Sequence, residues 1–338
     1  PHYKIIMVNP TAERVFYLIP GISHGRDFRD IFKSEALFNI VEDTIEKQNF
    51  TPKFTYPTFE WNYDRMTKHF QVKVFPVEKE DGARIAYIIL LEDVTKLKEL
   101  DQMKSDFISI ASHELRTPLT SILMSIAMVL EGSAGPLTPD QKELLAAANE
   151  DGVRMRYMMN NLLDISRIET GRMEMEFFPV SPDSLLISVV NSFNAQAQAK
   201  KIELVADIEK ELPNVYADYN RIMQVLNNLV SNALRYTPEG GKITLGAARG
   251  EDGLIEFRVE DTGSGIPRDY LKKVFRKFVQ VESDPKRGGA GLGLALSLEI
   301  IRAHHGTLWV ESELGKGSQF YFTLPVAKEE NGEDEIAI

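Results

Sequence analysis

The sequence contains no cysteine in its 338 residues. This absence excludes disulfide bonds, thiolate metal sites and cysteine nucleophiles, because each of them needs a thiol that the chain does not supply. It leaves the redox compartment of the protein undetermined, since a chain without thiols carries no mark of either environment.

Long apolar runs and an excess of positive charge are missing as well. The longest apolar runs, such as Ile85 to Leu91, fall far short of the roughly 20 residues that a membrane helix needs. The formal net charge of -11 disfavours nucleic-acid binding, which relies on lysine and arginine displacing counterions from phosphates. With 43% hydrophobic and 26% charged residues, the composition is that of a soluble protein. We therefore expect no nucleic-acid partner and no membrane segment in this chain.

The first residues of the sequence bear on where the protein works. The chain opens at Pro1 in what reads as the middle of a domain, so we expect a first domain that is truncated at its N-terminus. No signal peptide is visible, although a missing portion could hold membrane spans or a targeting segment. We expect a cytoplasmic protein, either soluble as a whole or the cytoplasmic part of a membrane-anchored protein.

The length predicts more than one domain, because 338 residues exceed the usual size of a single hydrophobic core. In residues 1–94, short apolar runs alternate with turn residues. The segments His69 to Val77 and Arg84 to Glu92 are predicted to pair as a hairpin around the intervening acidic and glycine-containing turn. We expect this part of the chain to form an α+β domain.

Residues 95–175 are predicted to form a long helix that continues into a helical hairpin. Leu100, Met103 and Phe107 recur at spacings of three and four residues, which is typical of a coiled-coil seam. Glycine and proline break the pattern after residue 130, and Thr138 is a suitable N-cap for a second helix that ends near residue 168. One hairpin buries too little apolar surface by itself, so we expect two copies to form a dimeric four-helix bundle.

Residues 176–327 are predicted to form an α/β sandwich, because helical and strand patterns alternate there. His304 and His305 close the last predicted helix and are interpreted as partners of its C-terminal dipole. The acidic residues 328–338 are predicted to be a disordered tail. The expected helices are residues 182–199, 218–235 and 292–304, and the expected strands are residues 201–208, 242–249, 254–261, 307–312 and 317–324.

Three segments of this domain favour a nucleotide site. Asn228 and Asn232 lie four residues apart on one helix face, so both amide oxygens can face a Mg²⁺ ion whose other ligands are phosphates and water. The segment from Asp261 to Ile266 places a carboxylate at a strand end, where it can accept a hydrogen bond from the exocyclic amine of adenine. The segment from Gly288 to Leu294 can turn several N–H groups toward one anion ahead of a helix N-terminus.

These segments resemble the N, G1 and G2 boxes of the histidine-kinase ATP-binding domain, a Bergerat-type α/β sandwich. P-loop and protein-kinase sites are excluded, because the chain lacks G-x-x-x-x-G-K-[ST] and an H-R-D to D-F-G series. By the resemblance, Asp261 recognises adenine, Asn228 and Asn232 hold Mg²⁺ and phosphates, and residues 280–287 form an ATP lid. The residues that the resemblance assigns to ATP are Asn228, Asn232, Arg235, Tyr236, Asp261, Gly263, Gly265, Ile266, Phe278, Gly289, Gly291, Leu292 and Gly293.

The segment from Phe107 to Thr120 resembles the H box of the same family almost residue for residue. The resemblance implies that His113 accepts the γ-phosphoryl group of ATP and that Glu114 acts as its base. His113 lies just off the apolar seam, so its ring should project from the bundle and be largely neutral at pH 7. Thr117 occupies the position of a polar residue that orients water for dephosphorylating the partner. Its hydroxyl could equally bond back to the carbonyl four residues earlier.

The first domain is similar to a PAS sensor domain in Asn9 to Arg14, in Gly21 and in the closing Leu91 to Thr95. Together, the resemblances imply a dimeric sensor histidine kinase that passes its phosphoryl group to an aspartate on a response regulator receiver domain. Two other functions stay open. One is an ATP-driven conformational clamp that hydrolyses ATP without His113, and the other is a degenerate kinase that acts as a nucleotide-regulated scaffold.

Overall fold

The structure is a computed structural model that describes residues 3–50, 56–63, 66–170, 172–251, 253–281 and 291–327. Contacts divide the chain into one unit up to Lys104 and a second from Ser105 onward. Each unit has its own apolar core. In the described part of the chain, no helix combines the length and the apolar character that crossing a bilayer demands.

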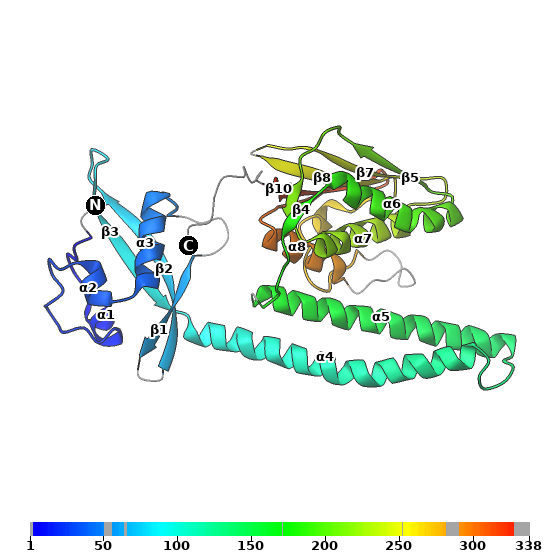
Figure 1. Cartoon of the computed structure of the whole chain (residues 1–338), viewed down its shortest axis with the longest axis horizontal. Helices are drawn as coiled ribbons and strands as arrows, with labels where there is room; N and C mark the ends of the chain where they lie inside the picture. The colour runs from blue at the N-terminus through cyan, green and yellow to red at the C-terminus, as the bar shows by residue number, and fades with distance from the viewer. Residues whose placement is uncertain are drawn as a thin grey trace, which may run out of the picture. The chain divides into compact units, whose positions relative to one another are not determined.

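The first unit is built on a three-stranded antiparallel sheet in the order β1-β2-β3 (Figure 1). The predicted hairpin is confirmed, since β2 and β3 pair antiparallel along their length. Phe70, Val72 and Val74 alternate along β2 and are buried, because successive strand side chains point to opposite faces. Its elements are α1 (Pro10–Val15), α2 (Phe28–Phe32), α3 (Glu35–Glu46), β1 (Thr58–Tyr63), β2 (Met66–Glu78) and β3 (Arg84–Asp93).

Two long helices, α4 (Thr95–Leu130) and α5 (Pro139–Glu169), form the predicted hairpin. Thr138 caps α5 in a capping box with Gln141, which satisfies N–H groups at the helix start. Leu119 and Leu123 of α4 pack against Met159 of α5 in a small buried cluster. The hairpin therefore closes on itself near its middle.

A five-stranded mixed sheet and three helices form the α/β sandwich of residues 178–327. The sheet order is β5-β7-β8-β10-β9, in which β5 pairs parallel with β7 and the other pairs are antiparallel. Figure 1 shows the helices on the side of the sheet that faces α5. The elements are β4 (Phe178–Val180), α6 (Pro182–Ala199), β5 (Glu203–Ile208), β6 (Val215–Ala217), α7 (Tyr219–Tyr236), β7 (Lys242–Arg249), β8 (Leu254–Asp261), α8 (Gly293–Ala303), β9 (Leu308–Glu313) and β10 (Gly317–Pro325).

His304, interpreted as a partner of the C-terminal dipole of its helix, contacts the last turn of α8 from a buried position. The side chain is buried, its Nε2 accepts the backbone N–H of Asp218 at 3.0 Å, and its Nδ1 lies 2.8 Å from the carbonyl oxygen of Ile300. Burial lowers the pKa of His304, which favours the neutral form of the ring. It joins the end of α8 to the start of α7 and thereby positions the helix that carries Asn228 and Asn232.

Candidate functional site

A pocket of about 870 Å³ lies in the second unit, between α7, the end of β8, the start of α8 and one face of α5. Several residues that the sequence assigned to the nucleotide meet at its walls, although they come from separate stretches of the chain. Those that line it are Asn228, Asn232, Arg235, Tyr236, Asp261, Gly265, Ile266, Gly291 and Gly293.

Asp261, at the end of β8, is the buried acid of this pocket, with 7% of its surface exposed. Its Oδ1 accepts the backbone N–H of Gly263 at 2.8 Å. Burial raises the pKa of Asp261 to about 6, although hydrogen bonds from the backbone N–H groups of Gly263 and Ser318 favour the ionised form. A carboxylate held in this way can accept a hydrogen bond from an amino group that enters the pocket.

Asn228 is held in a defined orientation by α8. Its Nδ2 donates to the Ser297 hydroxyl at 2.9 Å, which leaves Oδ1 available as an acceptor. A Cβ at Gly293 would lie 2.1 Å from that Oδ1, so the first residue of α8 must be glycine for the amide to keep its place. Asn232 lines the same pocket one helical turn further along α7.

The amide pair fits a hard cation that also binds phosphate. Amide oxygens are suitable ligands for Mg²⁺, which keeps several waters and is usually bound together with substrate phosphates. Within the described ranges, no group of three or more acidic or histidine side chains could hold a metal ion by itself. The donor set of the pocket therefore suits a metal that arrives with a phosphorylated ligand.

Three of the expected nucleotide residues that the structure describes do not line the pocket. The backbone N–H of Gly263 donates to Asp261, and Leu292 is buried at the start of α8. Phe278 is exposed, and its backbone N–H donates to the carbonyl of Gly291 at 2.9 Å. Gly289 lies outside the described residues, as do residues 282–287 of the expected lid.

One wall of the pocket was not anticipated from the sequence. Glu150, Arg154, Tyr157 and Met158 line it from α5, the second helix of the hairpin. Their spacing of four, seven and eight residues places them on one face of α5, which is a signal that the sequence does contain. The spacing alone does not predict a pocket wall, because it is equally typical of a helix face that packs within a bundle.

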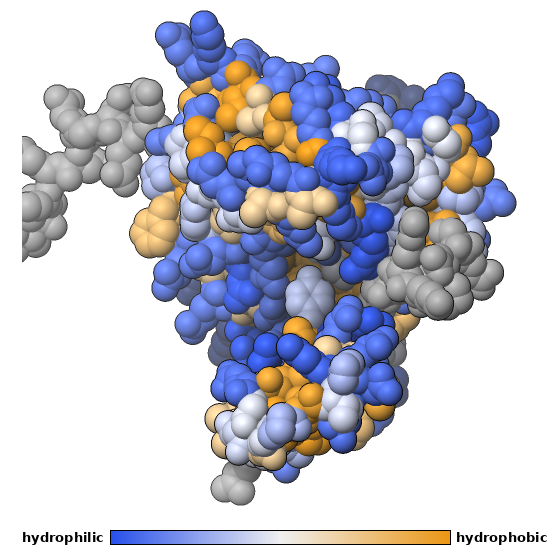
Figure 2. All heavy atoms as spheres, turned by 90° about the vertical axis from the view of Figure 1, so that its right-hand side faces the viewer, coloured by the Kyte–Doolittle hydropathy of each residue, from blue (hydrophilic) through white to orange (hydrophobic). Residues whose placement is uncertain are grey.

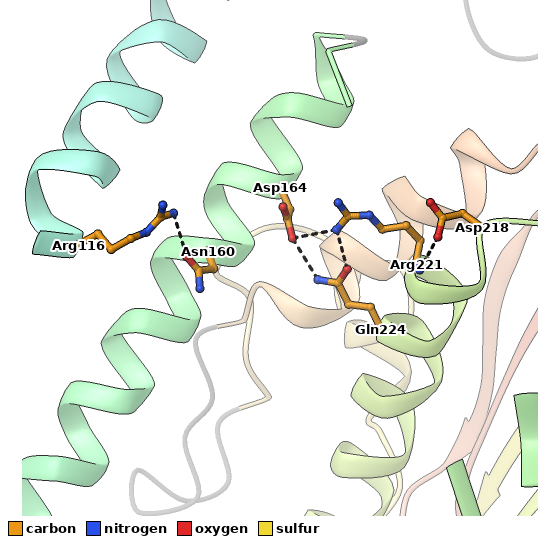
Figure 3. A network of polar contacts seen from close by, with 6 residues as sticks. All are labelled: Arg116, Asn160, Asp164, Asp218, Arg221 and Gln224. Atoms are coloured by element: carbon orange, nitrogen blue, oxygen red, sulfur yellow. Dashed lines mark hydrogen bonds and ion pairs between the residues drawn. The ribbon is translucent and has the colours of Figure 1, made fainter. Parts of the chain in front are cut away.

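Contacts next to the pocket hold the sandwich against α5 (Figure 3). Asp164 of α5 accepts hydrogen bonds from Arg221 at 3.4 Å and from Gln224 at 3.1 Å, both on α7. Ile165 is fully buried in the core of the sandwich, and Glu169 pairs with Lys277 at 2.7 Å. We call this arrangement, in which α5 contacts the sandwich, the docked arrangement.

His113 lies on α4 and is not among the residues that line the pocket. Its side chain is 76% exposed, and its Nδ1 lies 3.6 Å from Oε1 of Glu114. That orientation turns Nδ1 toward a carboxylate and leaves Nε2 directed away from it. One turn further along α4, the helix is joined to α5 by Arg116, which donates to Asn160 at 3.1 Å (Figure 3).

Thr117 is exposed on α4, as its proposed role requires. Nearby, Thr120 donates its hydroxyl to the carbonyl of Arg116 at 2.8 Å, which is the local bond that helical threonines commonly make. Within the described ranges, no corresponding bond from Thr117 to the carbonyl of His113 is found.

Two family models match this chain. Residues 103–171 match the His Kinase A (phospho-acceptor) domain, and residues 217–328 match the histidine kinase-, DNA gyrase B-, and HSP90-like ATPase. The first match contains the hairpin and the second contains most of the sandwich.

Known proteins show the same likeness. The chain is 36% identical over 323 residues to the alginate biosynthesis sensor protein KinB of Pseudomonas aeruginosa, covering 96% of this chain and 53% of KinB. It is 33% identical over 261 residues to the sensor histidine kinase WalK of Bacillus subtilis, covering 76% of this chain and 42% of WalK. The structure of full-length ShkA in complex with AMPPNP matches with a TM-score of 0.58 and 32% identity, over 66% of this chain and 46% of ShkA. The chain thus spans about half the length of these relatives.

Proposed function

The chain belongs to the sensor histidine kinases of two-component systems, and from this premise we propose that it transfers the γ-phosphoryl group of ATP to His113. The phosphoryl group then passes to an aspartate on a response regulator receiver domain. The observation that carries the proposal is the exposed His113 ring, with Nδ1 facing Glu114, in a chain whose sandwich presents the asparagine- and glycine-lined pocket.

Different pocket residues are assigned to different parts of Mg-ATP. Asp261 would accept a hydrogen bond from the adenine amine, and Asn228 and Asn232 would supply amide oxygens to a metal that binds with the phosphates. Mg²⁺ bound there would neutralise phosphate charge and polarise the transferred group. The N-cap residue Leu292 has an apolar side chain, which cannot accept hydrogen bonds from the N–H groups at the start of α8. These N–H groups can therefore bind phosphate oxygens, and the helix dipole favours the negative charge there.

His113 supplies the nucleophile. Its Nε2 lone pair forms the new N–P bond while the bond between the γ-phosphorus and the ADP oxygen breaks, so the electron pair leaves with ADP. Attack makes the opposite ring nitrogen acidic, and Glu114 lies where it can accept the Nδ1 proton.

Transfer requires a change of arrangement, since His113 does not line the pocket. In the docked arrangement, Asp164 and Ile165 hold the sandwich on α5. Release of these contacts would let the sandwich bring bound ATP to His113. The equilibrium between docked and released states is then the quantity that a signal must change.

A homodimer is proposed because one copy of the hairpin leaves large apolar side chains in solvent. Phe107 is 72% exposed, and Ile110 on the same helix is 65% exposed. Met128, near the end of α4, and Leu144, near the start of α5, are exposed as well. Figure 2 shows apolar surface in the lower part of its view. A second hairpin would bury these residues in a four-helix bundle.

The remaining parts of the proposal concern regulation and location. We assign the first unit to a PAS-like sensor domain, in agreement with its antiparallel sheet and flanking helices. Thr117 is exposed near His113 and is proposed to orient water when the response regulator is dephosphorylated. We place the kinase in the cytoplasm, where ATP and the response regulator are available.

Labelling with γ-phosphate-labelled ATP and Mg²⁺ tests the proposal. Wild type should acquire a label that is acid-labile and base-stable, as expected for phosphohistidine, and His113→Gln should lose it. His305→Gln is the matched control, because His305 is an exposed histidine away from the hairpin. Equal labelling of wild type and His113→Gln would refute the assignment, and ATP hydrolysis without any label would favour an ATP-driven clamp.

A further inference from the structure

The α5 wall of the pocket places a cation beside the proposed phosphate site. Asp164 of α5 contacts Arg221 and Gln224 near the start of α7. Residues that precede Asp164 on α5 and residues that follow Gln224 on α7 line the same pocket. α5 and α7 are therefore antiparallel, and both extend from this shared contact toward the pocket. The distances of their residues from the contact can be compared along the two helices.

Helical rise sets Arg154 level with Asn232. Arg154 precedes Asp164 by ten residues, which corresponds to about 15 Å at 1.5 Å per residue. Asn232 follows Gln224 by eight residues and Arg221 by eleven, or about 12 to 16 Å. Both residues line the pocket. By this comparison of helical rise, Arg154 is level with the end at which the amide pair would hold metal and phosphates.

The partners of Arg154 leave it able to bind an anion. Its Nη2 lies 3.6 Å from Asp151 and 3.9 Å from Glu150, and all three side chains are substantially exposed. Exposed pairs of this kind contribute little and exchange readily. A phosphate chain can instead accept two parallel hydrogen bonds from one guanidinium, a geometry that arginine offers and lysine does not.

We propose that Arg154 is a phosphate-binding residue of the nucleotide pocket in the docked arrangement. The inference rests on the proposed ATP site and adds to it a residue from the hairpin. Nucleotide then contacts both α5 and the sandwich, so bound nucleotide stabilises docking, and docking strengthens nucleotide binding by the same factor. Release of the sandwich toward His113 gives up the contact with Arg154.

Calorimetric titration of the full chain with Mg-ADP tests the assignment without relying on phosphoryl transfer. We expect Arg154→Ala to weaken binding roughly tenfold, as loss of a charge-assisted hydrogen bond does, and Arg154→Lys to recover part of it. Arg156→Ala is the matched control, since Arg156 is exposed on α5 and lies outside the pocket. Adenosine, which has no phosphates, should bind wild type and Arg154→Ala equally.

A double-mutant cycle connects the contact to docking. Asp164→Arg opposes Arg221 with a like charge and should weaken Mg-ADP binding, and Arg154→Ala should add little in that background. Two results would overturn the inference: Mg-ADP affinity of Arg154→Ala within about twofold of wild type, or an undiminished effect of Arg154→Ala when Asp164 is replaced. Wild type that binds no Mg-ADP would instead refute the proposed nucleotide site itself.

Discussion

Replacing Asp261 by asparagine should make the nucleotide-free sandwich more stable and its nucleotide binding weaker. Burial raises the pKa of this carboxyl from 3.8 to about 6. One pKa unit corresponds to about 1.4 kcal/mol, so ionising Asp261 costs about 3 kcal/mol more in the folded protein than in the unfolded chain. The asparagine side chain of the variant would carry no charge, and its Oδ1 could still accept the N–H of Gly263.

The pH dependence follows from the sign of the pKa change. Between pH 3.8 and about 6 the folded state binds the Asp261 proton more tightly than the unfolded state, so stability falls as pH rises through this window. The destabilisation is nearly complete above about pH 6 and amounts to about 3 kcal/mol at pH 7 but about 1.6 kcal/mol at pH 5. After allowance for one weakened hydrogen bond, Asp261→Asn should gain about 1 to 3 kcal/mol at pH 7 and about 1.3 kcal/mol less at pH 5.

Urea unfolding followed by tryptophan fluorescence measures the stability difference between wild type and Asp261→Asn in the sandwich. The chain has two tryptophans, Trp61 in the first unit and Trp309 in β9 of the sandwich. A Trp61→Phe background leaves Trp309 as the reporter, which avoids mixing the transitions of separate domains. Equal destabilisation of Asp261→Asn at both pH values would refute the reasoning, because lost hydrogen bonds and not charge burial would then dominate.

Three further predictions concern catalysis and the pocket. Asn232→Asp should lower autophosphorylation at least about a hundredfold by disturbing metal and phosphate geometry, with an unchanged circular dichroism spectrum; full activity would remove Asn232 from the metal site. Gly293→Ala should reduce Mg-ADP affinity in calorimetry, because a Cβ 2.1 Å from Oδ1 of Asn228 forces that side chain to turn away. Unaltered affinity would show that Asn228 is dispensable for nucleotide binding. Thr117→Ala should preserve autophosphorylation and reduce dephosphorylation of the response regulator severalfold; equal phosphatase rates would return Thr117 to a structural role.

Local sequence pattern determined the elements of this protein. Residues spaced by three and four predicted α4 and α5, and the observed helices end within a few residues of the expected positions. The succession of helical and strand patterns predicted the strands of the sandwich in the same way. The glycine-rich segments and the asparagine pair could also be found in sequence, since each needs its residues at fixed local spacing.

Contacts between distant segments were decided by the tertiary structure. The sequence contains Asp164, Arg221 and Gln224, yet nothing in their local spacing states that they meet across some 57 to 60 residues. The burial of His304 could not be predicted for the same reason, because it depends on the start of α7, 86 residues away. The position of Arg154 in the pocket could not be predicted either, because packing within a helical bundle explains the residue spacing of α5 equally well. Periodicity specifies which residues share a face, but the partner of that face is chosen by how whole elements pack.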